Sequence, residues 1–418
     1  MAVNRFAPYV TPEIEEHRMK VRKWAEAELA PVRDKYEEMN LDGLGKNFPR
    51  ELIGKMAKEG LFAAFVSKKY GGPGMSLLYD IITIEEVARI CGSFSALVDY
   101  TPTLGTNPIF TFGTEEQKKK YLPQIVKGEM LVSFGLTEPK WGSDIASLET
   151  TAKKEGNKYI INGEKKFIFL SNIADMLVVF AKTQPEAGAR GITAFLIETS
   201  REGISFPKQE KKMGLRAMPV SEIKFENVEA SPDDILGGPE QEGRGIYVAL
   251  DTLDHGRCGV AAQALGTAQA ALEQAARFAS ERSQFGQPIG NFEAVQWMLA
   301  DMAIKLDAAR LLAYRAAYLR DLALKGETDR RIVTFPAAMA KCYATEVATW
   351  AAHKAIQILG GRGFMMDPEY APVKELPMPE KLYRDCRVFE IYEGTNEVQR
   401  MVIARQVSRL YGKKEKKK

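Results

Sequence analysis

A carboxylate at a sharp backbone bend near the C-terminus is the strongest chemical signal in this sequence. Glu393 precedes Gly394 and Thr395, and the glycine permits a left-handed or closely packed backbone that a Cβ would block. Apolar residues at helical spacing follow over 398–410, so the bend leads into a helix. In an apolar cleft such a carboxylate has a raised pKa and can remove a proton from a weakly acidic C–H, whereas at the surface it is an ordinary turn glutamate.

The elements that must position this residue fall into three regions. Helices are predicted in the first region at 13–29, 51–59, 77–90 and 93–104, and from 115 onward. Strands are predicted in the second region at 131–135, 159–161, 176–180, 192–197 and 221–225. Long alanine-rich helices, typical of a bundle, are predicted in the third region at 261–282, 293–324 and 335–359. We therefore predict an α+β chain with a helical N-terminal domain (1–130), a middle antiparallel β domain (131–237), a C-terminal helical bundle (238–411) and a basic tail (412–418).

Composition limits the classes of protein. The 418 residues carry a formal charge of +3, and because the tail contains five lysines and one glutamate, the body is close to neutral. We therefore expect no nucleic-acid partner. The four cysteines and three histidines have no metal-binding spacing, and scarce cysteines fit a reducing compartment. No apolar run reaches membrane-spanning length and no leader pattern opens the chain, so we expect cytoplasmic residence.

Several motifs along the chain share one family's order and spacing. They are Tyr392 to Glu397, Leu136 to Pro139, Gly142 to Asp144, Asn162 to Lys165, Arg282 to Gly286, and Gln357 to Gly361. Together they resemble the acyl-CoA dehydrogenases over about residues 15–410. Within that family the region around 93–104 is similar to glutaryl-CoA dehydrogenases, and short-chain and alicyclic enzymes are also similar.

The resemblance implies the acyl-CoA dehydrogenase fold, which ends in a four-helix bundle, and a homotetramer that binds FAD at a subunit interface. It implies α,β-dehydrogenation of an acyl-CoA thioester, in which Glu393 takes the α-proton, flavin N5 takes the β-hydride and electrons pass to electron-transfer flavoprotein. The chain has no strand-linked G-x-G-x-x-G, so a nicotinamide site is not expected. One branch of the family has its base at the position of Gly256, which cannot abstract a proton.

The resemblance also assigns binding residues. Implied flavin contacts are Phe134, Leu136, Thr137, Ser143, Phe167, Phe169, Thr395 and Glu397. Contacts to the FAD of a neighbouring subunit are implied for Arg282, Ser283, Phe285, Gln357, Gly360 and Gly361. Substrate contacts are implied or considered for Ser143, Asp254, Arg257, Gly394, Phe94 and Asp99.

Three departures from the family pattern affect the substrate prediction. Phe169 stands where a threonine usually donates to flavin N5, and the bulky pair Lys140 and Trp141 follows Glu-Pro. Phe94 stands where glutaryl enzymes have a carboxylate-binding arginine, which disfavours glutaryl-CoA. Asp99 is either a solvated helix residue or a second polar group facing the substrate.

The substrate therefore stays open among short, branched, cyclic and aryl-bearing acyl groups. Two other classes remain: a flavin oxidase or monooxygenase on the same fold, and a non-catalytic relative that binds acyl-CoA or nucleic acid.

Overall fold

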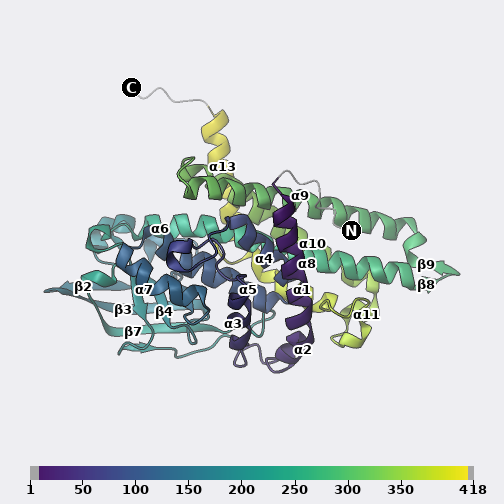
Figure 1. Cartoon of the computed structure of the whole chain (residues 1–418), viewed down its shortest axis with the longest axis horizontal. Helices are drawn as coiled ribbons and strands as arrows, with labels where there is room; N and C mark the ends of the chain where they lie inside the picture. The colour runs from purple at the N-terminus through teal and green to yellow at the C-terminus, as the bar shows by residue number, and fades with distance from the viewer. Residues whose placement is uncertain (1–8, 413–418) are drawn as a thin grey trace.

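A computed structural model describes residues 9–412, so the predicted tail 412–418 lies outside the described residues except for Gly412. Helices, then strands, then helices follow one another along the chain, which confirms the predicted order and the α+β class (Figure 1). A single large apolar core runs through both helical regions and one face of the sheet, and a smaller core covers the other face. The sheet is therefore packed directly against the helices that carry the rest of the site.

In the described part of the N-terminal region, from residue 9 onward, there are seven α-helices. They are α1 (Pro12–Glu28), α2 (Ala30–Glu38), α3 (Arg50–Lys58), α4 (Leu77–Ile90), α5 (Gly92–Tyr100), α6 (Asn107–Phe112) and α7 (Glu115–Val126). Helix α4 is buried on nearly every side and packs against α1, α5 and α8. Helices α5 and α6 are joined by a π-helical turn, Thr101–Thr106, whose Pro102 has no N–H to donate.

Seven strands form the main sheet. They are β1 (Val132–Gly135), β2 (Thr151–Glu155), β3 (Lys158–Phe169), β4 (Met176–Lys182), β5 (Ile192–Glu198), β6 (Ile204–Ser205) and β7 (Val220–Ala230). The order is β1-β4-β2-β3-β7-β6, with β5 also paired to β4. Most strand pairs are antiparallel, as predicted, but β4 pairs in parallel with both β1 and β2. The chain returns to β1 only after the β2–β3 hairpin, and such a crossover permits parallel pairing.

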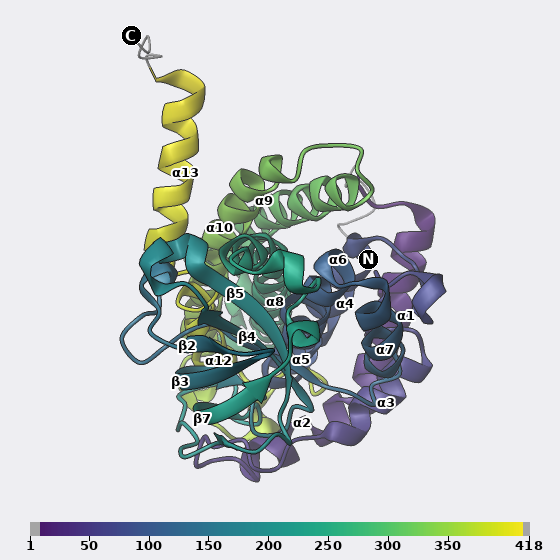
Figure 2. The same ribbon diagram turned by 90° about the vertical axis from the view of Figure 1, so that its left-hand side faces the viewer.

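Three long helices dominate the C-terminal region. The elements are α8 (Gly245–Glu281), β8 (Ser283–Gln284), β9 (Gln287–Pro288), α9 (Glu293–Leu324), α10 (Thr334–Leu359), α11 (Gly361–Phe364), α12 (Pro379–Cys386) and α13 (Asn396–Tyr411). Helix α8 begins well before the predicted residue 261. The prediction began too late because Gly256 and Gly259, which disfavour a helix locally, lie inside it. The expected four-helix bundle is, in this chain, three long helices with the shorter α12 and α13 packed on α10. Helix α13 projects away from the body (Figures 1 and 2).

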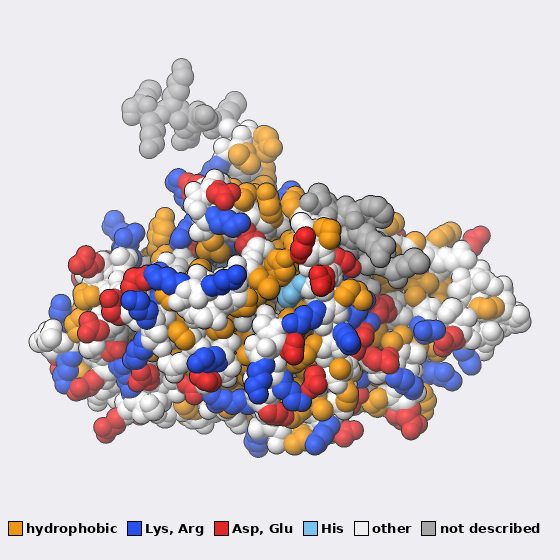
Figure 3. Space-filling view, viewed as in Figure 1, with side chains coloured by type: hydrophobic (Ala, Val, Ile, Leu, Met, Phe, Trp, Pro, Cys, Tyr) orange, Lys and Arg blue, Asp and Glu red, His pale blue; other side chains and the backbone are white. Residues whose placement is uncertain are grey.

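The outer surface mixes both signs of charge, and hydrophobic side chains lie on the projecting α13 (Figure 3). Within residues 9–412, no helix is long and apolar enough to cross a membrane. In the same range, no group of three or more histidine, cysteine and acidic residues is arranged to hold a metal ion.

Candidate active site

The predicted bend is present, and both of its residues have left-handed backbone conformations. Glu393 has φ 53° and Gly394 has φ 89°. Thr395 then caps α13, since its hydroxyl accepts from the N–H of Val398. A left-handed glutamate is strained, and such strain is found where the surrounding structure holds a functional residue in place.

Polar contacts beneath the bend hold it in this conformation. The Nζ of Lys341, a buried residue of α10, donates to the carbonyl of Gly394 at 2.9 Å and to Asn396 Oδ1 at 2.9 Å. The side-chain amide of Gln399 donates to the same Gly394 carbonyl at 2.9 Å. Burial lowers the pKa of Lys341 to about 8, while the nearby Glu393 carboxyl acts in the opposite direction. The turn is therefore fixed from the α10 side, and the Glu393 side chain is free to point elsewhere.

The Glu393 carboxyl is buried and incompletely hydrogen-bonded. Its Oε2 atom has no partner among the described residues. Burial raises the pKa of this carboxyl well above its usual value, and the charge of Asp99 raises it further. Lys341 and Arg257 act in the opposite direction. A desolvated carboxylate with an unused lone pair is suited to accept a proton.

Helix α8 makes room for this carboxyl by lacking a side chain. A Cβ added to Gly256 would overlap with Glu393 Oε2 and would lie 3.0 Å from its Cδ. It would also lie 2.8 Å from Leu104 Cδ2. Gly256 therefore has two consequences. It cannot serve as the base, and because it has no side chain, the Glu393 carboxyl can occupy the space beside it.

Two adjoining cavities of about 240 and 530 Å³ meet at Glu393. The lining residues include some from the end of β1, the loop after it, the end of β3, helices α5 and α8, and the bend. Predicted site residues on these walls are Phe134, Leu136, Thr137, Ser143, Phe167, Phe169, Arg257, Glu393, Gly394 and Thr395. The structure therefore brings together in one cleft most of the residues that were assigned to the flavin ring and the acyl group.

The walls fit a flat, partly apolar cofactor. Phe167 lies within a bulge between β3 and β7 and has φ 58°. The residue is 55% exposed and lines both cavities. A strained, exposed aromatic ring on a cleft wall is well placed to stack on another ring. The loop after β1 forms another part of the wall. There the buried Lys165 donates to the carbonyl of Leu136 and pairs with Glu138 at 2.7 Å. This ion pair fixes the loop that carries Thr137.

Arg257 and Asp254 form a pair one turn apart on α8. Arg257 donates to Asp254 Oδ1 at 2.6 Å, and Thr334 donates to Oδ2 at 2.5 Å. Burial raises the pKa of Asp254. Of the two residues, Arg257 lines the cavity and Asp254 does not, and Asp254 is bonded to the Arg257 guanidinium.

Other predicted residues lie far from this cleft in the same chain. Arg282, Ser283 and Phe285 belong to the β8–β9 hairpin, and Gln357, Gly360 and Gly361 lie at the end of α10. Both ends are at the far side of the long helices (Figure 1). From Gly256 to Arg282 the 26 residues of α8 span about 39 Å. Glu397 is exposed in the first turn of α13 and is not among the cleft-lining residues.

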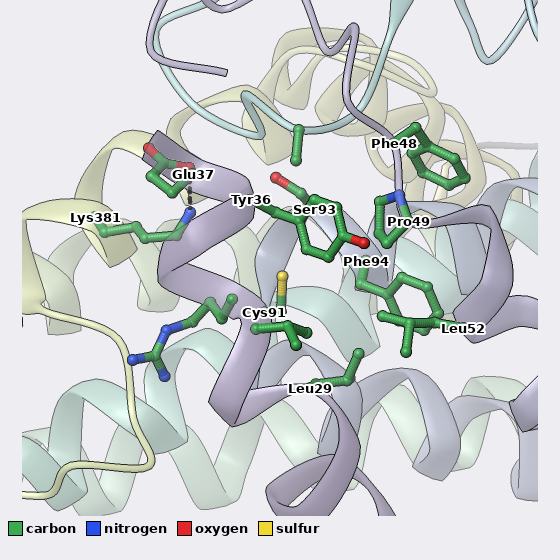
Figure 4. Close-up of a pocket in the computed structure, with 13 residues that line it drawn as sticks. Leu29, Tyr36, Glu37, Phe48, Pro49, Leu52, Cys91, Ser93, Phe94 and Lys381 are labelled. Carbon is green, nitrogen blue, oxygen red and sulfur yellow. Dashed lines mark hydrogen bonds and ion pairs between the residues drawn. The ribbon is translucent and has the colours of Figure 1, made fainter. Parts of the chain in front are cut away.

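Phe94 also lies outside the cleft. It is 2% exposed, stacks on Trp24 with ring centroids 6.3 Å apart, and lines a separate cavity of about 10 Å³ near the Glu37–Lys381 pair (Figure 4). That volume suits about one water molecule, not an acyl chain. The structure does not bring Phe94 to the substrate position that we predicted. Asp99, on the same helix, is buried beneath Glu393 instead.

Several residues of the site were not identified from the sequence. They are Tyr100, Leu104, Leu253 and Tyr392 in the cleft wall, and Lys341 and Gln263 behind it. The first group consists of side chains that look like ordinary core residues. A lysine among the alanines of α10 was a usable signal, because an unpaired lysine is rarely fully buried. Of the bulky pair after Glu-Pro, Lys140 lines the larger cavity and is paired with Glu149.

Comparison with known proteins agrees with this architecture. Three family models match residues 11–129, 133–228 and 243–408, and they describe the N-terminal, middle and C-terminal domains of acyl-CoA dehydrogenases. The 3-(aryl)acrylate reductase of Clostridium sporogenes is 42% identical over 95% of this chain and 98% of its own length. The caffeyl-CoA reductase–Etf complex subunit CarC of Acetobacterium woodii is 42% identical over 93% and 96%.

Among solved structures, butyryl-CoA dehydrogenase from Megasphaera elsdenii superimposes with a TM-score of 0.86 and 36% identity. The match covers 95% of this chain and 98% of that one. The fold and the cleft define an oxidoreductase that acts on the CH–CH bond of an acyl-CoA thioester. The chain belongs to the acyl-CoA dehydrogenase family.

Proposed function

We propose that Glu393 is the base of an FAD-dependent α,β-dehydrogenation of an acyl-CoA thioester. The observation that carries this proposal is that Glu393 lines the cleft while its buried Oε2 has no partner in the described part of the chain. Its raised pKa matches a base that must remove a proton from carbon. Arg257 and Lys341 stabilise its anion before the transfer.

The cofactor assignment rests on the shape and chemistry of the cleft. When bound, FAD supplies the acceptor for the hydride that leaves Cβ. Phe167 and Phe169 would hold its ring from the β3 side, with Phe134 and Leu136 as apolar contacts. Thr137, Ser143 and Thr395 offer hydroxyl groups along the same walls. In this reading Phe169 contributes apolar area where relatives donate a hydroxyl.

The remaining FAD contacts require a second copy of the chain, so we propose a homotetramer with shared sites. The β8–β9 hairpin and the end of α10 cannot reach the cleft of their own chain, because α8 separates them by tens of ångströms. Phe285 at the hairpin tip is 94% exposed with φ 51°. Large exposed apolar residues also recur every seven residues along α9. They are Trp297, Ile304, Leu311 and Tyr318.

For the acyl group we propose an aryl-bearing substrate from the set that the sequence left open. The ring centroids of Tyr100 and Phe169 are 5.6 Å apart, and those of Phe169 and Tyr392 are 5.8 Å apart. All three side chains line the cavity at Glu393. Aromatic pairs at such spacing gain energy beyond their buried area. The relatives named for aryl acrylate and caffeyl-CoA are in keeping with this choice.

Those two relatives are named as reductases, and the same residues serve that direction. In reduction Glu393 returns its proton to Cα, since a base in one direction is the acid in the other. We propose electron-transfer flavoprotein as the electron partner, in line with the Etf complex named for the Acetobacterium woodii relative. The four cysteines are buried and free, which fits our proposal of a reducing, cytoplasmic setting.

Flavin bleaching in a stopped-flow instrument tests the proposal. The FAD-loaded protein is mixed without oxygen with butyryl-, isobutyryl-, cyclohexanecarboxyl-, glutaryl- and 3-phenylpropionyl-CoA. We expect 3-phenylpropionyl-CoA to bleach fastest and Glu393→Gln to slow bleaching by about 10⁴-fold, the upper range for a general base. Glu390→Gln is a matched control, because Glu390 lies on the same segment and bonds Thr349 outside the cleft. Wild-type bleaching by Glu393→Gln would refute the assignment of the base, and a colourless protein that takes up no FAD would refute the cofactor.

A further inference from the structure

A second buried carboxyl lies one helical turn from the proposed base along α8. Asp99, at the end of α5, is 1% exposed. A Cβ added to Gly259 would overlap with Asp99 Oδ1 and would lie 2.6 Å from its Cγ. Gly256, three residues earlier, makes the same kind of space for Glu393. Residues three apart share one face of a helix, about 5–6 Å from each other, so the two carboxyls occupy neighbouring notches of α8.

Hydrogen bonds connect Asp99 to the wall of the cleft. The side-chain amide of Gln263, on the next turn of the same α8 face, donates to Asp99 Oδ2 at 2.5 Å. The Tyr392 hydroxyl donates to Gln263 Oε1 at 2.9 Å. Tyr392 adjoins Glu393 in sequence and lines the cavity. The chain from Asp99 through Gln263 therefore ends on the residue that precedes the base.

Thr103 allows Asp99 to exist in either protonation state. Its hydroxyl lies 2.9 Å from Asp99 Oδ1 and 2.8 Å from the Asp99 carbonyl. When Asp99 is ionised, the hydroxyl donates to the carboxylate. When Asp99 is protonated, the hydroxyl donates to the carbonyl and accepts from Oδ1. Burial raises the pKa of Asp99 to about 7, so both states are within reach near neutrality.

The charged and titratable groups around this pair come from each element packed against it. They are Arg257 and Cys258 of α8, Lys341 of α10, Tyr100 of α5, and Tyr392 beside the base. Arg257 is already bonded to Asp254, and Lys341 is bonded to the backbone of the bend. No described cation is paired with Asp99 itself, whose recorded partners are Gln263 and Thr103. Among the described residues, Asp99 is therefore an unpaired carboxyl whose charge opposes ionisation of the base.

We propose that Asp99 is a positioning residue that acts through Glu393 and Tyr392: its charge sets the acidity at which the base becomes available, and its bond to Gln263 holds the aromatic floor of the acyl cavity. This inference rests on the proposed role of Glu393. It assigns Asp99 no contact with the reacting carbon. The substrate contact considered for Asp99 from the sequence is thereby replaced by an indirect role.

Asp99→Asn tests the charge while keeping the hydrogen bonds. Asparagine can accept from Gln263 and donate to Thr103. The rate of flavin bleaching by 3-phenylpropionyl-CoA is measured from pH 5 to 10 in the FAD-loaded protein. Without a negative neighbour, Glu393 ionises at lower pH, so we expect the acid limb of the profile to move down by about 1–2 pH units. Below that limb the variant then reduces its flavin faster than the wild type, which a merely structural defect would not produce.

Gln263→Leu tests the connection separately. It keeps Asp99 but removes the bond to Tyr392, so we expect a higher KM for 3-phenylpropionyl-CoA with little change for butyryl-CoA. Asp80→Asn is the matched control, since Asp80 is equally buried, burial raises its pKa to about 7, and it bonds only backbone N–H groups of residues 64 and 65. It should leave the acid limb in place.

A second measurement does not depend on catalysis, so it still tests the inference if the chosen thioester is not a substrate. Infrared difference spectra follow the protonated-carboxyl band of Glu393, identified by its loss in Glu393→Gln, through a pH titration. An unmoved titration and an unmoved acid limb in Asp99→Asn would overturn the inference. If Glu393→Gln is inactive while Asp99→Asn behaves as the wild type, only this inference fails. If Glu393→Gln bleaches normally, the proposed base itself fails.

Discussion

Gly256→Ala is the most specific test of how the base is positioned, because it adds one methyl group to the notch that Glu393 fills. The new Cβ would lie 3.0 Å from Glu393 Cδ and would overlap with Oε2. Carbon atoms in contact prefer about 3.5–4.0 Å, so the carboxyl must retreat by about 1 Å. A misplacement of that size at a reacting group costs about 10²-fold in rate. We therefore expect flavin reduction to slow by about 100-fold.

The fold should survive this change. Alanine in a helix interior is about 1 kcal/mol more favourable than glycine, which offsets the adjustment of Leu104, whose Cδ2 would lie 2.8 Å from the new carbon. The assay is anaerobic stopped-flow bleaching with the thermal midpoint and FAD content measured on the same samples. Gly54→Ala in α3 is the matched control, since no atom lies within 4 Å of its added Cβ. If Gly256→Ala reduced its flavin at the wild-type rate, the idea that Gly256 positions the Glu393 carboxyl would be wrong.

Three further outcomes are expected. Phe285→Asn places a residue suited to left-handed backbone before Gly286, so the hairpin itself should become less strained. FAD occupancy and the tetramer content seen on gel filtration should nevertheless fall, because the exposed ring is lost. Full retention of both would contradict the shared site. Lys165→Met leaves the Glu138 carboxylate buried without its cation and should lower the unfolding free energy by about 3–5 kcal/mol, whereas an unchanged urea midpoint would show that the pair is dispensable. Burial lowers the pKa of His17 to about 4, so the unfolded chain binds the extra proton first as pH falls from 6.5. Of the stability that the wild type loses between pH 6.5 and 4, His17 should account for about 3 kcal/mol, so His17→Gln should lose that much less in urea titrations at the two pH values.

The sequence predicted elements best where apolar spacing was regular. The bounds of α4 and α9 agree with the predicted 77–90 and 293–324. Helix α2 was not identified, since Pro31, two residues after the predicted first helix, favours an end to helical structure. The predicted start of α8 was too late because of its two internal glycines. Parallel pairing of β4 depends on a crossover between distant segments, which no local pattern encodes. The exact domain boundaries stay a prediction.

The bend at Glu393 could be predicted because its signal is local. A glutamate followed by glycine and threonine predicts a turn from the sequence alone, and the structure has that turn at the cleft. The positions of side chains on α5 were harder to predict, because the face of the helix on which a residue lies determines which residues it contacts. Phe94 and Asp99 are five residues apart, so they point about 140° away from each other around the axis. The resemblance placed Phe94 at the substrate and left Asp99 either solvated or facing the substrate. In the fold Phe94 packs on Trp24 and Asp99 bonds Gln263 of α8.

The position of the base is decided on α8 as much as on the turn that carries it. Gly256 and Gly259 leave two notches on one helix face, and each is filled by a carboxyl from another part of the chain. Either notch would be closed by any side chain larger than hydrogen. The sequence shows these residues as two glycines in a long helix, which local propensity alone counts as a cost of about 1 kcal/mol each. Their function can be recognised only from the structure, in which Glu393 and Asp99 pack against them. Substitutions at these glycines should therefore lower the rate of flavin reduction more than they lower the stability of the fold.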